Sequence, residues 1–236
     1  MQERGKSAST IKTDLAAIRF YHDMMGQTKY RLPKNDELAV ELERRRFGQK
    51  DRTWSVREFN LFLVTAMADG RKDFAAIACL TWYAGLRIHE CFRIDTAIAE
   101  RALRENAVTI KGKGGKLRTV PINESIRIEL QKFLAVTPRG HKLFVLDGLP
   151  THHAIGQLQQ YIYQVRPKIQ DADSTRPMTH HGLRHSYAAR TWQELVDSGV
   201  SPFNASLRVS QLLGHERPDV TRIYLASIPK DGADGD

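Results

Sequence analysis

The strongest constraint on the fold is a short pair of β-branched runs inside an otherwise helical pattern. Val108–Lys111 and Leu117–Pro121 flank a turn that contains Gly112, Gly114 and Gly115. Two such runs on either side of a glycine-rich turn predict an antiparallel hairpin. Because the rest of the chain has helical spacing, the sequence predicts a mainly α fold with one small antiparallel β-sheet, the α+β class.

Helical spacing of apolar residues predicts the other elements. Ser9 and Thr10 can cap a first helix that ends at Gly26, and Ser55 with Glu58 forms a capping box ahead of a second apolar stripe. Further helices are expected at Glu37–Arg45, Asp73–Ala84 and Ile88–Ile94, after the cap residue Asn123, and at His152–Val165, His181–Val196, Leu207–Leu213 and Pro218–Leu225.

The chain is expected to contain a short N-terminal part and one main domain. Residues 1–45 hold too few helices for an independent core, so this part is either a fragment or packs against something else. A basic linker is expected at residues 46–54, the main domain at residues 55–228 and a disordered tail at residues 229–236.

Composition favours a polyanionic partner and argues against a membrane protein. The 236 residues carry a formal net charge of +9, which favours nucleic acid as a partner, although charge alone does not decide this. No apolar run reaches the roughly 18 residues of a membrane span. Cys79 and Cys91 lie in apolar surroundings and are expected to be buried, reduced thiols of an intracellular protein.

Two motifs could each bind an anion. Gly85 permits a tight junction between helices, Arg87 then starts the next helix, and Glu90 can brace it. An ordinary ion pair at a helix start is the simpler explanation of these residues alone. The turn Lys111–Lys116 is rich in lysine and glycine and could approach a phosphate, although a solvated basic turn is again the simpler explanation.

Three further motifs lie toward the C-terminus. His181 and Arg184 share a helix face, so the histidine could handle a proton while the arginine holds an anion. His181 and His185 could instead ligate a metal, but no acidic ligand is near them in the sequence. Taken singly, His215 and Tyr224 would more often be structural residues.

In their order and spacing, these motifs resemble the signature of the tyrosine recombinase, or phage integrase, family. Gly85–Glu90 is similar to the family's Gly-Leu-Arg followed by Glu, and His181–His185 is similar to its His-x-Leu-Arg-His box. Leu213–His215 matches its Leu-Gly-His element, and Tyr224 follows nine residues later. The basic hairpin lies between the two boxes, where the family carries its catalytic lysine.

This resemblance, which spans Trp54–Ile228, implies metal-independent DNA cleavage and rejoining through a 3′-phosphotyrosine, with no cofactor. Lys113 best matches the lysine position, with Lys111 and Lys116 as alternatives. The implied catalytic residues are Arg87, Lys113, His181, Arg184, His215 and Tyr224, supported by Glu90 and His185. The residues expected to bind DNA are Arg44, Arg45, Arg46, Lys50, Lys111 and Lys116.

The resemblance also implies a role and partners. Residues 1–45 are similar to the end of the family's helical core-DNA-binding domain, but shorter. The expected role is integration or excision of a bacterial mobile element or phage, in the cytoplasm at the nucleoid. The partner would be double-stranded DNA, bound by a homotetramer that is monomeric without it. Two other functions stay open: a non-catalytic DNA-binding regulator of the same fold, and DNA relaxation like that of type IB topoisomerases.

Overall fold

The structure, a computed structural model, describes residues 6–26, 29–38, 42, 51–112, 115, 117–214 and 224. The chain divides into two compact units, Met1–Phe47 and Gly48–Asp236. The first unit contains helix α1, Ala8–Met24. Its cap is Ser7, one turn earlier than predicted, because the extended backbone at this residue lets the hydroxyl accept the Thr10 N–H at 3.1 Å.

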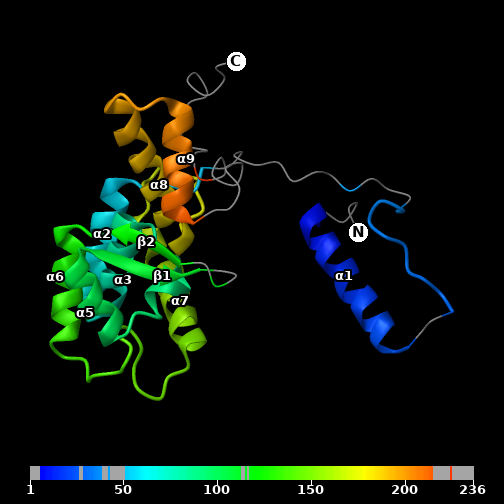
Figure 1. Cartoon of the computed structure of the whole chain (residues 1–236), viewed down its shortest axis with the longest axis horizontal. Coiled ribbons are helices and arrows are strands. Elements are labelled where there is room, and N and C mark those ends of the chain that lie inside the picture. Colours follow the sequence, from blue (N-terminus) through cyan, green and yellow to red (C-terminus); the bar gives the residue numbers. More distant parts are fainter. Residues whose placement is uncertain are drawn as a thin grey trace. The chain divides into compact units, whose positions relative to one another are not determined.

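The second unit is mainly helical, and within its described residues there is one small sheet (Figure 1). Strand β1, Ala107–Lys111, pairs antiparallel with β2, Leu117–Pro121, so that Thr109 lies opposite Thr119. The predicted fold class is therefore confirmed. The helices are α2 (Val56–Ala68), α3 (Lys72–Ala84), α4 (Ile88–Cys91), α5 (Thr96–Glu105), α6 (Glu124–Leu134), α7 (Thr151–Ile169), α8 (His180–Asp197) and α9 (Pro202–Leu213).

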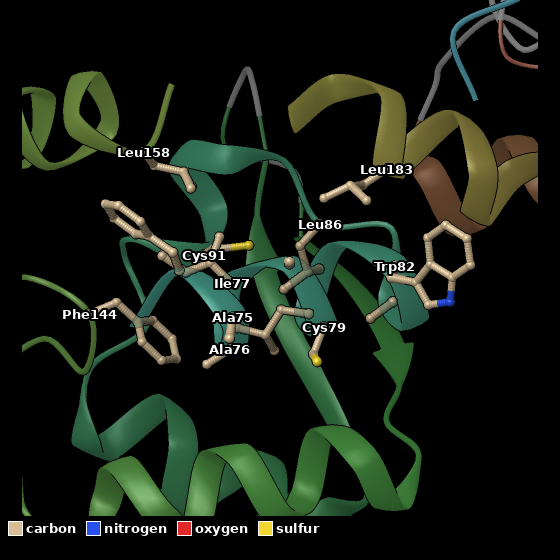
Figure 2. Packing of buried hydrophobic residues seen from close by; sticks show 14 of the residues in the cluster. Ala75, Ala76, Ile77, Cys79, Trp82, Leu86, Cys91, Phe144, Leu158 and Leu183 are labelled. Carbon is tan, nitrogen blue, oxygen red and sulfur yellow. The ribbon is translucent and has the colours of Figure 1, made fainter. Parts of the chain in front are cut away.

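Helix α3 forms the centre of the main apolar core. Every residue from Phe74 to Trp82 is buried, and the helix packs against α2, α6 and α8. Figure 2 shows Ile77 of α3 in this core, with Leu158 of α7 and Leu183 of α8 nearby. Burial on all sides explains why α3 has no polar face. This core fixes the ends of α3 and α8, from which the site residues project.

A second apolar cluster lies between α8 and α9. It contains Tyr187 and Trp192 of α8, Val209 and Leu213 of α9, and Tyr224. This smaller cluster holds the C-terminal part of the described chain against the same helix that carries the second sequence box. It therefore brings Tyr224 to α8, where Tyr187 lies 37 positions earlier in the sequence.

Some elements differ from the sequence-based predictions. Helix α5 was not predicted, although Ala99 and Ala102 are buried and Ile98 and Leu103 pack against the core. Helix α7 continues to Ile169, past the predicted end at Val165, with Pro167 in its last turn.

One other helix prediction needs correction, and two lie largely outside the described residues. Helix α9 begins at Pro202 rather than Leu207, since Ser201 caps it. The helices predicted at Glu37–Arg45 and Pro218–Leu225 lie mostly outside the described residues, and Glu37, Leu38, Leu42 and Tyr224, which are described, are not helical.

Both cysteines are buried, as predicted. Cys79 and Cys91 are both buried and free, and burial raises the pKa of each thiol to about 12. Across the described ranges, none of the helices combines the length and the apolar character that crossing a membrane requires.

Candidate active site

Arg87 occupies the first position of a helix junction that Gly85 makes possible. Gly85 ends α3 with φ +61°, and the ring of Tyr187 occupies the space that a side chain at this position would need. The Arg87 backbone N–H donates to Glu90 Oε2 at 2.7 Å, and Arg87 Nη1 donates to Glu90 Oε1 at 2.9 Å. Glu90 therefore holds both the backbone and the guanidinium of Arg87.

Glu90 itself is a buried carboxylate surrounded by arginines. The residue is 1% exposed, and Arg118 Nη2 donates to its Oε2 at 2.5 Å. Burial alone would raise the pKa of Glu90. The guanidinium of Arg118, together with the N–H and guanidinium of Arg87, outweighs that effect and lowers the pKa below its ordinary value. Glu90 is therefore ionised at neutral pH.

Arg184 is fully buried and joins two segments. Its Nη1 donates to the carbonyl of Gly85, and its Nη2 donates to the carbonyl of Leu213 at 2.5 Å. Burial and the nearby charge of Arg87 lower the pKa of Arg184 to about 10, so the side chain stays charged at neutral pH. The helix junction and the end of α9 are thus fixed around one cation.

Tyr224 packs against the second box. Its ring lies nearly parallel to that of His185, with 4.4 Å between centroids, and 5.4 Å from the ring of His181. The Arg184 Cζ atom lies 5.6 Å from the Tyr224 centroid. The residue is only 6% exposed, so the tyrosine is held in place rather than projecting into solvent.

The environment of His181 keeps its imidazole neutral. Desolvation of the ring and the positive charges of Arg184, Arg52 and Arg87 lower the pKa of His181 to about 4. A neutral imidazole can accept a proton. The rings of His181 and His185 lie 5.1 Å apart. In the part of the chain that the structure describes, no group of three or more His, Cys, Asp or Glu side chains could hold a metal ion.

The structure brings together every predicted catalytic or supporting residue that it describes. Arg87, Glu90, Arg184, His181, His185 and Tyr224 all lie at the junction of α3, α4 and α8. Lys111 ends β1 and is exposed. The remaining predicted residues lie outside the described residues: Lys113, Lys116, His215, Arg44, Arg45, Arg46 and Lys50.

Sequence reasoning missed Trp54, which fastens the start of α8. Its backbone N–H donates to Ser186 Oγ at 2.7 Å, and its Nε1 donates to the Thr179 carbonyl at 2.9 Å. A side chain at Gly182 would lie 2.8 Å from the Trp54 indole. Trp54 and Ser186 are 132 residues apart, so no local pattern could have paired them. Arg118 was missed for the same reason.

A groove of about 420 Å³ opens beside Arg87 and His181. Its walls include Tyr163 and Arg166 of α7, with the Arg166 guanidinium 5.1 Å from the Tyr163 ring centroid. Arg87 and Arg166 both line the groove and give it positive charge, which suits a polyanion.

Comparison with known proteins places this chain in a family. Residues 61–230 match the phage integrase family. Tyrosine recombinase XerD of Listeria monocytogenes is 26% identical over 94% of this chain and 73% of its own length. Tyrosine recombinase XerC of Brucella suis is 32% identical over 64% of this chain and 45% of its own length.

Solved structures of recombinases share the fold. The lambda integrase dimer bound to a COC' core site has a TM-score of 0.66 at 14% identity, covering 99% of this chain and 63% of that chain. The Tn1549 transposon integrase in complex with a circular intermediate DNA has a TM-score of 0.61 at 18% identity, covering 99% and 80%. Because the family match extends over more than half of the sequence, the chain belongs to the phage integrase family and is a tyrosine site-specific recombinase.

Proposed function

We propose that this recombinase cuts and rejoins DNA through a covalent bond to Tyr224. The observation that supports this proposal is the packing of Tyr224 against His185, at 4.4 Å between ring centroids, next to the buried cation of Arg184. A tyrosine held beside a fixed cation and a neutral imidazole has the groups that nucleophilic attack on a phosphodiester requires.

In the proposed cleavage step, Tyr224 Oη attacks the scissile phosphorus, and the bond from phosphorus to the 5′ oxygen breaks. His181 accepts the phenolic proton, and Lys113 donates a proton to the leaving 5′ oxygen. The products are a 3′-phosphotyrosine and a 5′-hydroxyl. When the 5′-hydroxyl of another strand attacks the phosphotyrosine, the phosphodiester is restored and Tyr224 is released, so the exchange needs no ATP.

The two arginines of the boxes would stabilise the charge that develops in this step. Negative charge accumulates on the non-bridging phosphate oxygens, and guanidinium groups match it in sign and geometry. Arg87 and Arg184 are the proposed clamp, and His215 would add a hydrogen bond. Glu90 supports this role through its two bonds to Arg87. Since fixed cations of the protein supply the charge, we expect cleavage in the presence of a chelator.

The proposed biological role is integration and excision of a mobile element at the nucleoid, by four protomers acting on two duplexes. Phosphate contacts would come from the basic residues Arg44, Arg45, Arg46, Lys50, Lys111 and Lys116. Each such contact releases counterions, so DNA affinity should fall steeply as salt rises.

Covalent trapping tests the chemistry. The protein is incubated with EDTA and nicked duplexes taken from the DNA that flanks its gene, so that a short fragment leaves and rejoining is blocked. We expect a protein–DNA adduct that survives SDS, and none with Tyr224→Phe. Tyr161→Phe is the matched control, because the Tyr161 hydroxyl donates to Asp69 at 2.7 Å and its ring packs against Phe62 and Phe74 of the apolar core.

Two results would contradict the proposal. If Tyr224→Phe still formed the adduct in full, Tyr224 would not be the nucleophile. If the protein bound DNA but formed no adduct, a non-catalytic regulator would be favoured. Relaxation of supercoiled plasmids that lack a recombination site, without strand exchange between two sites, would instead indicate topoisomerase-like activity.

A further inference from the structure

Arg118 of β2 contacts two segments of the site that are far apart in sequence. Its side chain is 9% exposed. Nη2 donates to Glu90 Oε2 at 2.5 Å, and Nη1 donates to the Leu212 carbonyl at the end of α9, also at 2.5 Å. One guanidinium therefore bridges Glu90 of the first box and the end of α9, where the Leu-Gly-His element begins.

The first contact bears on Arg87. The Glu90 oxygen that accepts from Arg118 is the same oxygen that accepts the Arg87 backbone N–H, and the other carboxylate oxygen accepts from the Arg87 guanidinium. Arg118 thus fixes the orientation of the carboxylate that orients Arg87. Without Arg118, Glu90 would be free to rotate away from one of its two bonds to Arg87.

The second contact bears on the end of α9. Arg118 and Arg184 donate to successive carbonyls there, those of Leu212 and Leu213. Gly214 then leaves the helix with φ +65°, and a side chain on it would lie 2.6 Å from Arg118 Cδ. The stem of Arg118 therefore packs on the residue that immediately precedes His215.

We infer that Arg118 is a positioning residue for DNA cleavage, which holds Arg87 through Glu90 and sets the exit of the chain from α9. This inference rests on the proposed function of strand cleavage. Arg118 does not itself need to touch the phosphate.

The pH dependence of cleavage separates positioning from simple support of the fold. The charged groups around Glu90 are Arg118 of β2, Arg87 next to α4 and Arg184 of α8. Without the positive charge of Arg118, less opposes the effect of burial, which raises the pKa of Glu90; the pKa of Glu90 therefore rises. Glu90 would then take up a proton, and lose its hold on Arg87, at a higher pH than in the unmodified protein. The acid limb of the pH profile should therefore move to higher pH.

The experiment compares Arg118→Ala, Arg118→Lys and Arg127→Ala with the unmodified protein. The readouts are the single-turnover rate of adduct formation at saturating nicked DNA, the DNA Kd, the pH profile and the melting temperature. Arg127 is a matched control: its Nη1 donates to the Leu103 carbonyl at 3.0 Å and to Asn106 Oδ1 at 2.6 Å, at the end of α5.

With Arg118→Ala we expect the rate to fall about 10- to 100-fold, the scale for outer-shell partners of reacting groups, with the Kd little changed. The acid limb should shift to higher pH. Arg118→Lys keeps the charge but not the fork, so it should restore the acid limb and recover only part of the rate. Arg127→Ala should lower the melting temperature and leave the rate and profile unchanged.

Two outcomes would overturn the inference. One is a rate of adduct formation and a pH profile in Arg118→Ala that equal those of the unmodified protein. The other is a loss of rate that tracks the melting temperature equally in Arg118→Ala and Arg127→Ala. Failure of the proposed function would look different, since the unmodified protein would then form no adduct. If Arg118→Ala does not fold, Arg118→Lys still tests the inference. A reduced rate of adduct formation with an unshifted acid limb would support it, and an unchanged rate would contradict it.

Discussion

The apolar core around α3 and the charged centre around Arg184 are equally buried, yet they are held together differently. Ile77 and Leu80 are 0% exposed in the first region, as is Arg184 in the second, where Glu90 is 1% exposed. The apolar side chains are held by contact area, which has no preferred direction. The charged side chains are held by hydrogen bonds with defined donors and acceptors.

This difference predicts opposite responses to substitution. An apolar core can repack around a small change, so the cost follows the volume removed. In the charged centre, removing one partner leaves another charge or carbonyl buried without its hydrogen bond. Substitutions in the first region should therefore change mainly stability, whereas those in the second should also change the geometry of the reacting groups.

Arg184→Lys should have the largest effect, and it is confined to the charged centre. A lysine has a single ammonium and cannot reproduce the fork that joins the carbonyls of Gly85 and Leu213. We expect the single-turnover rate of adduct formation to fall about 100- to 1,000-fold. Arg190→Lys is the control on the same helix, because Arg190 Nη2 donates to the Trp82 carbonyl at 2.8 Å and stacks on that indole. Equal rates of adduct formation for the two variants would contradict the claim that the charged centre controls the geometry of the reacting groups.

Ile77→Val should show the opposite pattern, with a moderate loss of stability and no loss of chemistry. Ile77 is 0% exposed in α3, and removing one methylene from such a site costs about 1 kcal/mol. Urea denaturation measures the free energy of unfolding, and trapping measures the rate on protein that is still folded. A slow rate at a temperature where Ile77→Val is fully folded would show that the apolar core also controls the geometry of the site.

His180→Gln should have the smallest effect, visible only as a change with pH. Burial, and then the neighbouring His181, lower the pKa of His180 to about 3, against about 6.5 in an unfolded chain. Between these values the unfolded state binds a proton that the folded state does not. The free energy of unfolding therefore falls as pH drops below about 6.5.

Glutamine can keep the hydrogen bond that His180 Nε2 makes with Thr81 Oγ1 at 3.0 Å, and it does not titrate. Chemical denaturation of His180→Gln between about pH 6.5 and 4 should therefore show a shallower loss of stability. The exposed His153→Gln is the control and should follow the unmodified protein. Identical slopes for all three proteins would show that His180 does not couple folding to pH.

The parts of the site that sequence could predict are those that depend on neighbouring residues. The capping box of Ser55 and Glu58 is present, with the Glu58 N–H donating to Ser55 Oγ at 3.1 Å. Gly85 ends α3, and Glu90 braces Arg87, as the spacing indicates. Such features were predictable because a helix turn fixes which residues meet three or four positions apart.

Sequence by itself determined the fold class, the hairpin and the family signature, because each is encoded in local spacing or in side-chain chemistry. Only the tertiary structure decided that Arg118 would share Glu90 with Arg87, that Trp54 would fasten α8, and that Tyr224 would stack on His185. Those contacts join residues 28, 125 and 39 positions apart. They form when the apolar clusters bring distant helices together, and no local pattern in the chain specifies which buried polar groups then face one another.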